Sequence, residues 1–561
     1  MARNAPLLRG LLVVVLAALG GLAHAEQPKA RPVRHLPRVE QLGLTIAREN
    51  PTYNQLVRIA KPRGKVTQYG TLAFSSSPLQ RSPSRAVQDG QVTAADRKAL
   101  TRAVASLQGQ KLIETWGKLG TGRDARVVRL VVPEKYAQDA ALSDILFPRI
   151  TARERGQLGW AQQEGFTTVM IPDYGRKPRI LVDTDRRVTY VLGSSYFGER
   201  KKSALRMWWR ELKETRGAIP LHASAMTVIL RGEGGELARH STIVLGHSGT
   251  GKSTLSTGDE GLSAAAGERI IAHQDDAGAL VRTGKGPRSW RFVGTEHGMY
   301  LKTEGVSPTS DPGAYEGIAA TGRRARVGFD NVAVGAAGKV DFLDTSANKN
   351  GRAAVDRKLI SMSRGQPINM GRPQSIVMIS RHELLPAIAR VPAGQPEKGA
   401  FAYALGESVK TSAAGGSGET IRETGFSSFI VGPPAKEANR MLDFLREQSR
   451  TSSGTRAYIM NTGSVRTAEG LVKVQKSDTM RLLRAMQRGA ITWQLDPRLG
   501  LEVPVAVKGM TDAELQRLGV GRGMSPAELG QLTDRVRADR VEFLKKNLPD
   551  LDAAIIARGA Y

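Results

Sequence analysis

Periodic apolar positions along the chain predict a mixed α/β protein made of many short elements. The first half alternates apolar strand segments with amphipathic helices, and its last helix carries Met207, Trp208 and Trp209, which we expect in the core. Strands are expected at 69–74, 126–132, 167–171, 179–182 and 187–192, and helices at 39–58 with a break at Asn50-Pro51, 93–107 with Thr93 as N-cap, 137–147 and 201–215.

From about His222 onward, short apolar strand segments become frequent. Strands are expected at 227–230, 241–245, 269–271, 279–281, 289–293, 339–342, 375–379 and 456–460, and helices at 437–447, 478–488 and 525–548. Ser525 is a suitable N-cap for the last helix, with Pro526 at its first position. The segment 394–425 is rich in Gly, Ser and Ala, and its length and low apolar content predict a mobile lid.

The N-terminus has the pattern of a secretory signal peptide. Arg3 and Arg9 form a positive n-region before an apolar stretch over 11–22, and Ala23-His24-Ala25 forms a small-x-small cleavage site. The stretch is too short to span a membrane, and no later stretch has the roughly 18 apolar residues of a transmembrane helix. We therefore expect a signal peptide at 1–25, a basic, proline-rich linker at 26–38, and a periplasmic or secreted protein. An uncleaved anchor is the alternative.

Composition limits the partners and the chemistry. Lys and Arg number 82 against 53 Asp and Glu, and the net charge of +29 favours anionic partners such as nucleotides and carboxylates. A basic protein near an anionic envelope would show the same excess. The positive residues are scattered, with no basic block interleaved with aromatics, so no specific nucleic acid is expected. The absence of cysteine excludes disulfides, thiolate nucleophiles, thiolate zinc sites and iron–sulfur clusters.

The segment 241–256, STIVLGHSGTGKSTLS, has the strand, glycine-rich loop and helix order of a phosphate-binding loop. Its glycines allow backbone N–H groups to surround phosphate oxygens, and the helix that follows adds its positive dipole end. Lys252 is expected to reach the outer phosphates, and the Ser253 hydroxyl to ligate a divalent metal. The alternative is a glycine-rich turn with a chance Gly-Lys-Ser. The segment predicts binding of a nucleoside triphosphate without defining the reaction.

Other polar residues suit a site around a triphosphate. Asp275 and Asp276 follow a predicted strand downstream of the loop, where a carboxylate commonly anchors the metal, although paired aspartates also occur at ordinary turns. His222 begins a strand-like segment, and a lone histidine is more often structural. The basic segment 196–202, YFGERKK, lies between a strand and a helix and is either functional or a solvated turn.

These motifs together resemble those of the ATP-dependent phosphoenolpyruvate carboxykinase family. GHSGTGKSTLS at 246–256 is similar to the family's GLSGTGKTTLS, GSSYFGERKK at 193–202 to GTWYGGEMKK, LHASA at 221–225 to MHCSA, and QDDAG at 274–278 to GDDEHG. Further similar segments are NPTY at 50–53, RSP at 81–83, YLKT at 300–303, SANKNGR at 346–352 and AYIMNTG at 457–463. The matches follow the family order from about residue 40 to 505.

The resemblance implies a two-domain carboxykinase-like α/β fold. Residues 39–220 would form a mixed α/β substrate domain, and 221–561 a P-loop mononucleotide-binding domain that carries the lid at 394–425. Arg81 and Tyr196 would bind the substrate carboxylates, and Arg352 would stabilise the transferring phosphoryl group. Lys202, His222 and Asp276 would ligate Mn²⁺, and Ser253 would meet Mg²⁺. The nucleotide would be bound by Gly246, His247, Ser248, Gly249, Thr250, Gly251, Lys252, Ser253, Lys302, Asp311 and Arg352, with Asp311 at the ribose.

The implied reaction is the gluconeogenic one: oxaloacetate and ATP give phosphoenolpyruvate, ADP and CO₂, with Mn²⁺ and Mg²⁺, in an enzyme we expect to be a monomer. The chain departs from the family at the substrate loop 80–85, at Met226, and at 415–424, where Arg422 is the counterpart of an adenine-side arginine. A signal peptide also directs it away from the cytosol, where the family acts. The alternatives are an exported phosphotransferase with another substrate and a non-catalytic nucleotide-binding paralogue.

Overall fold

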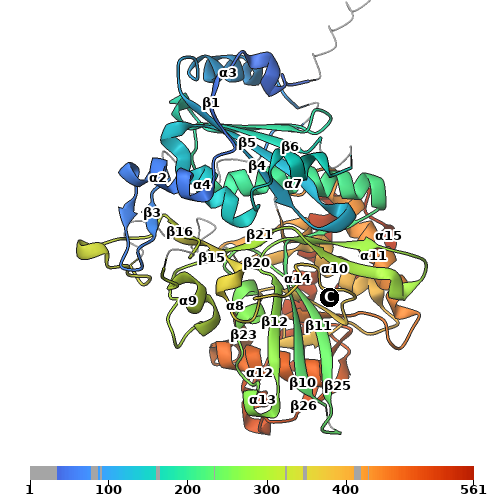
Figure 1. The fold of residues 1–561 in the computed structure, drawn as a ribbon. Coiled ribbons are helices and arrows are strands. Elements are labelled where there is room, and N and C mark those ends of the chain that lie inside the picture. The colour runs from blue at the N-terminus through green and yellow to red at the C-terminus, as the bar shows by residue number, and fades with distance from the viewer. Residues whose placement is uncertain are drawn as a thin grey trace, which may run out of the picture.

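The computed structural model describes residues 35–76, 86–88, 91–159, 164–232, 234–322, 325–344, 350–409, 418–427 and 429–561. The predicted signal peptide, most of the predicted linker 26–38 and Arg81 lie outside these residues. The described chain is a mixed α/β protein, as predicted (Figure 1). Within the described residues, no helix is long and apolar enough to cross a membrane.

The N-terminal part is built on a six-stranded mixed sheet with the order β1-β4-β5-β6-β8-β7. One face packs against α3, and the other packs against α2, α4 and α7. The strands are β1 (Ile46–Glu49), β4 (Leu112–Leu119), β5 (Arg126–Pro133), β6 (Phe166–Ile171), β7 (Arg179–Asp183) and β8 (Val188–Leu192). The helices are α2 (Tyr53–Ala60), α3 (Ala94–Ala105), α4 (Ala137–Leu146), α5 (Ala152–Gly156) and α7 (Phe197–Arg216).

Local signals in this part are mostly confirmed. Thr93 caps α3 as predicted, because its hydroxyl accepts from the Asp96 N–H at 3.1 Å while the Asp96 carboxylate accepts from the Thr93 N–H. The helix predicted over 39–58 is wrong in its middle, where β1 pairs in parallel with β4. That pairing joins segments more than 60 residues apart, so it overrides the local periodicity.

The C-terminal part is built on an eight-stranded mixed sheet with the order β12-β10-β11-β18-β22-β19-β26-β25. Its central strands β11, β18 and β22 run parallel, with α10, α11 and α15 against one face and α8 and α12 against the other. The strands are β10 (Ala223–Arg231), β11 (Leu237–Leu245), β12 (Arg269–Gln274), β18 (Ser375–Ile379), β19 (Ile388–Arg390), β22 (Arg456–Met460), β25 (Ile491–Asp496) and β26 (Leu501–Val507). The helices are α8 (Lys252–Thr257), α9 (Pro312–Ile318), α10 (Pro396–Leu405), α11 (Pro434–Ser449), α12 (Lys476–Arg488), α13 (Asp512–Arg517), α14 (Pro526–Asn547) and α15 (Ala553–Gly559).

Smaller sheets connect the two parts. A five-stranded sheet, β15-β17-β16-β3-β2, combines β2 (Lys65–Val66) and β3 (Leu72–Phe74) with β15 (Gly298–Lys302), β16 (Val327–Asp330) and β17 (Arg352–Asp356). The segments before and after the predicted boundary at 220 therefore share one sheet. The remaining strands are β9 (Ile219–Leu221), β13 (Gly278–Arg282) and β14 (Trp290–Gly294) in one sheet, and the pairs β20 (Glu407–Val409) with β21 (Thr420–Arg422) and β23 (Ser464–Thr467) with β24 (Gly470–Lys473).

Two predictions for the second half are wrong. The strand expected at 339–342 is absent, and only Val340 forms an isolated bridge, to Val334. Residues 396–405 of the lid predicted over 394–425 form the buried helix α10. Its small residues allow close packing: a Cβ on Gly399 would lie 2.7 Å from a Leu445 methyl group. The Gly and Ala content that suggested a loop therefore serves helix packing, and a lid could involve only the residues after α10.

Replacement of Trp209 by alanine is expected to destabilise the fold by about 3–5 kcal/mol. Trp209 is fully buried, donates from Nε1 to the Gly278 carbonyl at 2.9 Å, and stacks on Phe429 with ring centroids 5.1 Å apart. Leu471→Ala is the control, because Leu471 is 58% exposed and should change the free energy of unfolding by less than about 0.5 kcal/mol. Urea denaturation measures both, and equal midpoints for the two variants would contradict the assigned core.

Candidate functional site

The glycine-rich loop between β11 and α8 has the backbone geometry that its sequence predicts. Gly249 and Gly251 adopt φ of +80° and +114°, a region that disfavours residues with side chains. The Thr250 hydroxyl donates to the His247 carbonyl at 2.8 Å and closes the loop on itself. The predicted loop residues 246–253 all lie on this turn and on the first residues of α8.

Lys252 turns inward beneath the loop. Its buried ammonium donates to the Gly246 carbonyl at 2.8 Å and lies 3.2 Å from His222 Nε2 and 3.8 Å from Asp276 Oδ1. Burial lowers the pKa of Lys252 to about 8, and the neighbouring Arg352 adds to this while Asp276 opposes it. The structure thus brings together three of the predicted site residues at one point.

His222 lies between a backbone carbonyl group and a carboxylate. Its Nδ1 donates to the Phe426 carbonyl at 2.7 Å, and its Nε2 lies 3.1 Å from Asp276 Oδ1. Burial and the Lys252 charge lower the pKa of His222, which favours the neutral ring with its proton on Nδ1. Nε2 therefore presents a lone pair toward Lys252 and Asp276.

Asp276 is oriented by Lys201, which also contacts Glu296, and the sequence analysis singled out neither residue. Its Oδ2 accepts from Lys201 at 2.7 Å, and the same ammonium lies 3.2 Å from Glu296 Oε1. Burial alone would raise the pKa of Asp276, but the Lys201 and Lys252 ammonium groups hold it well below its usual range. Burial raises the pKa of Glu296 to about 8. Lys201 stands beside the predicted Lys202, so the adjacent lysine pair was its only local signal.

Lys202 points to another side of α7. Its ammonium lies 3.7 Å from Glu199 Oε1 and 5.4 Å from the centroid of the Phe429 ring. Burial lowers the pKa of Lys202, as a metal-ligating amine requires, although Glu199 and Asp276 oppose the shift.

A chain of polar groups links the phosphate-binding loop to Tyr196. Arg352, at the start of β17, donates to the Ser248 hydroxyl and to the Asn350 side-chain oxygen, each at 3.2 Å. Asn350 in turn donates to the Tyr196 hydroxyl at 3.2 Å. Burial raises the pKa of Tyr196, so the phenol stays protonated. The predicted Arg352 and Tyr196 are therefore joined through Asn350, which the sequence analysis did not identify.

The other predicted nucleotide residues lie around this core. Lys302 is the β15 partner of Arg352 in the strand ladder and pairs with Glu304. Asp311 caps α9 by accepting from the Ala314 N–H at 3.2 Å, and it also accepts from the Thr257 hydroxyl at 3.3 Å. Its carboxylate therefore has a structural role in this state, and contact with a ribose stays a prediction.

The loop is supported from outside by residues at the ends of neighbouring parallel strands. Arg381 follows β18 and donates to the Thr462 hydroxyl at 3.0 Å and to the Thr250 carbonyl at 3.4 Å, while Thr462 donates to Thr250 at 3.0 Å. Thr462 belongs to the motif AYIMNTG, but Arg381 was not predicted. The common sheet edge where β11, β18 and β22 end would have indicated it.

A second support is the β20–β21 pair. His247 donates to the Gly406 carbonyl at 2.7 Å. The next residue, Glu407, is buried and accepts from Arg540 at 2.9 Å and from Arg422 at 2.8 Å. Arg422, the predicted counterpart of an adenine-side arginine, is thus engaged in holding this strand pair. The loop is thereby tied to α14, which carries Arg540.

The donor atoms at His222 and Asp276 fit a divalent cation. The lone pair of the neutral His222 ring faces an oxygen of the Asp276 carboxylate. These two electron-rich atoms repel each other unless a cation lies near both. Lys252 supplies one such charge. Imidazole nitrogen with carboxylate oxygen also suits Mn²⁺ or Mg²⁺, and the Nδ1–H bond to Phe426 is the usual support of a metal-bound histidine. Among the described residues no three His, Asp or Glu side chains cluster for a metal, so the third protein ligand would be a residue such as Lys202.

Comparison with known proteins gives consistent matches. The profile of the phosphoenolpyruvate carboxykinase family matches residues 47–513. The chain is 31% identical over 387 residues to a phosphoenolpyruvate carboxykinase (ATP) of Aeropyrum pernix, covering 67% of this chain and 71% of that protein. It is 28% identical over 415 residues to that of Mesorhizobium japonicum, covering 70% and 69%. The matched region contains every predicted site residue.

Glu407→Gln is expected to destabilise the protein by about 3 kcal/mol at pH 7. Burial disfavours this carboxylate, but Arg540 lowers its pKa to about 2, below its ordinary value of 4.5. The stabilisation is therefore complete above pH 4.5 and is lost as the pH falls toward 2. Near pH 2 the wild-type protein and the Glu407→Gln variant should therefore have similar free energies of unfolding.

Urea denaturation at several pH values measures this difference. Glu383→Gln is the control, because Glu383 forms a partly exposed ion pair with Arg466 and should cost less than about 1 kcal/mol. A Glu407→Gln effect that does not shrink below pH 4.5 would contradict the assigned role.

Proposed function

Because the chain belongs to the phosphoenolpyruvate carboxykinase family, we propose that it converts oxaloacetate and ATP to phosphoenolpyruvate, ADP and CO₂. One observation carries the proposal: Lys252 of the phosphate-binding loop lies 3.2 Å from His222 and 3.8 Å from Asp276. A phosphate-binding group and two metal-type donors therefore meet at one point, as phosphoryl transfer requires.

The nucleotide side of the reaction would depend on the loop and on Arg352. Backbone N–H groups of 248–253 would surround the β- and γ-phosphates, and Lys252 would neutralise their charge. Arg352 is held against the loop by its bonds to Ser248 and Asn350, so its guanidinium is preorganised for the transferring phosphoryl group.

The substrate side would depend on Tyr196 and on Arg81, which would hold the carboxylate of oxaloacetate. Loss of CO₂ leaves an enolate, whose oxygen attacks the γ-phosphoryl group and releases ADP. Mn²⁺ held by His222, Asp276 and Lys202, with Mg²⁺ at Ser253, would stabilise the negative charge that develops on these oxygens. Lys201 keeps the Asp276 carboxylate oriented, and the Phe426 carbonyl fixes the His222 tautomer.

A non-catalytic nucleotide-binding role is less well supported. Simple phosphate binding requires the loop and Lys252, and it gives no reason to keep His222, Asp276 and Arg352 beside them. An exported phosphotransferase with another substrate would keep all of these groups and differ on the side of Arg81. The substrate therefore decides between the two catalytic functions.

An activity assay tests the proposal. Residues 26–561 are expected to form phosphoenolpyruvate from oxaloacetate and ATP with Mn²⁺ and Mg²⁺. Lys252→Ala should lower kcat at least about 100-fold, because it removes a preorganised cation from the transition state. Arg81→Ala should also abolish most product formation. Lys473→Ala, on the exposed surface of β24, is the control and should leave kcat unchanged.

ATP turnover without phosphoenolpyruvate, insensitive to Arg81→Ala, would contradict the carboxykinase proposal and support the exported phosphotransferase. Omission of both metals should abolish product in every active variant.

We also propose that the chain is exported. A fusion of residues 1–30 to alkaline phosphatase, which is active only outside the cytoplasm, should give active reporter. Leu16→Arg interrupts the apolar stretch and should leave the reporter inactive, because a charged residue prevents recognition as a signal peptide. Cytoplasmic retention of the unmodified fusion would contradict export.

A further inference from the structure

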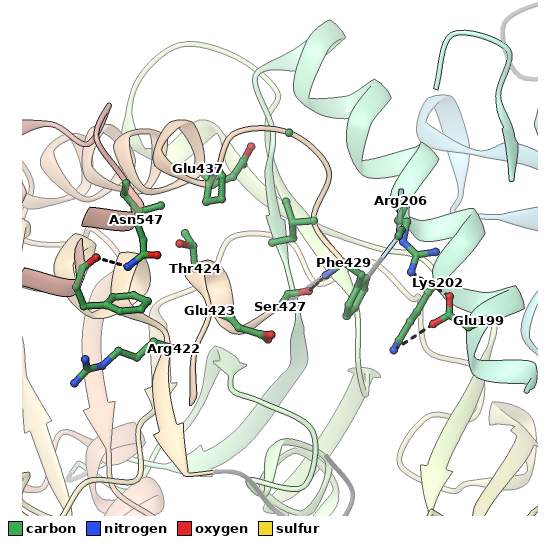
Figure 2. Close-up of a pocket in the computed structure, with 16 residues that line it drawn as sticks. Glu199, Lys202, Arg206, Arg422, Glu423, Thr424, Ser427, Phe429, Glu437 and Asn547 are labelled. Carbon is green, nitrogen blue, oxygen red and sulfur yellow. Dashed lines mark hydrogen bonds and ion pairs between the residues drawn. The ribbon is translucent and has the colours of Figure 1, made fainter. Parts of the chain in front are cut away.

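A pocket of about 310 Å³ lies on the six-stranded sheet of the N-terminal part. Its floor includes a row of ladder partners on four neighbouring strands, β4, β5, β6 and β8: Trp116, Arg129, Thr167 and Val188. Val188 belongs to the apolar cluster that includes α3, so the row lies on the α3 face of the sheet. Helix α7 packs against the opposite face, and none of the residues drawn in Figure 2, around Lys202 and Arg206, lines this pocket.

Arginines from separate segments meet at this pocket. Its described lining includes five arginines and two glutamates. The arginines come from the chain before β1, from β5, from α5 and from the turn between β7 and β8: Arg38, Arg129, Arg155, Arg186 and Arg187. Like charges gathered in this way repel each other, so the cluster needs carboxylate partners or a bound anion.

The carboxylates at the pocket are already engaged by two of these arginines. Each of the two pairs with two carboxylates: Arg129 with Glu40 and Glu114, and Arg187 with Glu164 at 3.1 Å and Glu211 at 3.3 Å. Although burial opposes the shift, Arg129 and Arg38 lower the pKa of Glu40. These carboxylates therefore compensate the charges of Arg129 and Arg187.

Arg155 and Arg186 form no ion pair with a carboxylate of the described chain, and both are half-buried. The guanidinium carbon of Arg155 lies 4.2 Å from the centroid of the Trp116 ring, a contact that leaves its N–H groups available to a ligand. Arg186 Nη1 donates to the Leu36 carbonyl at 3.2 Å and to Gln41 Oε1 at 3.0 Å, and both of these acceptors are neutral. Two positive charges at the pocket thus lack a negative partner.

We propose that this pocket binds the phosphate group of a small phosphate ester, with the phosphate between Arg155 and Arg186. A phosphate monoester carries a charge of about −1.5 to −2 at neutral pH, which matches these two arginines. Guanidinium groups bind phosphate oxygens through two parallel hydrogen bonds, and the contact with Trp116 holds Arg155 in place beforehand. The volume lies at the lower end of the roughly 300–1,000 Å³ of small-molecule sites, so it leaves room for a small organic group.

Calorimetric titration with glycerol 3-phosphate at constant ionic strength tests the proposal. Glycerol 3-phosphate should bind, while glycerol, which lacks the charge, should show no binding. Arg155→Met and Arg186→Met should each raise the Kd about tenfold, because each removes a charged hydrogen-bond donor. Arg153→Met is the matched control. Arg153 lies on the same helix α5 but is exposed and does not line the pocket, so the same loss of charge should change the Kd less than twofold.

The phosphate-binding loop is a second place where the probe can bind, so the titrations are repeated with Lys252→Ala. Binding should persist in this variant and should still weaken when Arg155 is replaced. Loss of all binding in Lys252→Ala would assign the probe to the loop and overturn the proposal, while leaving the carboxykinase proposal unaffected. Thermal unfolding shows whether each variant is folded, and Arg155→Met decides if Arg186→Met is not. Absence of binding, or a Kd insensitive to Arg155→Met, would also overturn the proposal.

Discussion

The carboxylate of Asp276 is the group on which the arrangement of the site depends. Lys201, His222 and Lys252 approach it at 2.7, 3.1 and 3.8 Å from three different elements. Two lysines could not be buried so closely without a negative partner, because burial of an uncompensated charge costs several kcal/mol. Helix α7, the start of β10 and the phosphate-binding loop are therefore held in a fixed relation by one side chain.

The loop itself is held by a second, outer set of contacts. Thr462 and Arg381 bond the Thr250 carbonyl from the ends of β22 and β18, and Gly406 bonds His247 from the β20 side. Glu407 then carries the connection to Arg540 on α14. Residues far from the phosphate site in sequence thus determine how rigidly the loop is presented. This rigidity matters because electrostatic stabilisation of phosphoryl transfer requires preorganised groups.

The accuracy of the sequence predictions followed the range of the interactions behind them. The N-caps Thr93 and Ser525 and the left-handed glycines of the loop were predictable, because each depends on hydrogen bonds or torsions within a few residues. The segment 39–58 was not, because β1 exists only through its pairing with β4. Helix α10 was mistaken for a loop, because its Gly and Ala content has meaning only against α11 and α15.

The same contrast between short-range and long-range interactions holds for the site. The sequence by itself determined the phosphate-binding loop, the residue types of its metal-type donors and the resemblance to one family, since these are carried by contiguous motifs. Only the tertiary structure decided that Lys201 faces Asp276 while Lys202 faces Glu199, because adjacent residues on a helix point about 100° apart. It also decided the links through Asn350 and Glu296. Burial and charge pairing between distant segments create these features, and neither is encoded in a local pattern.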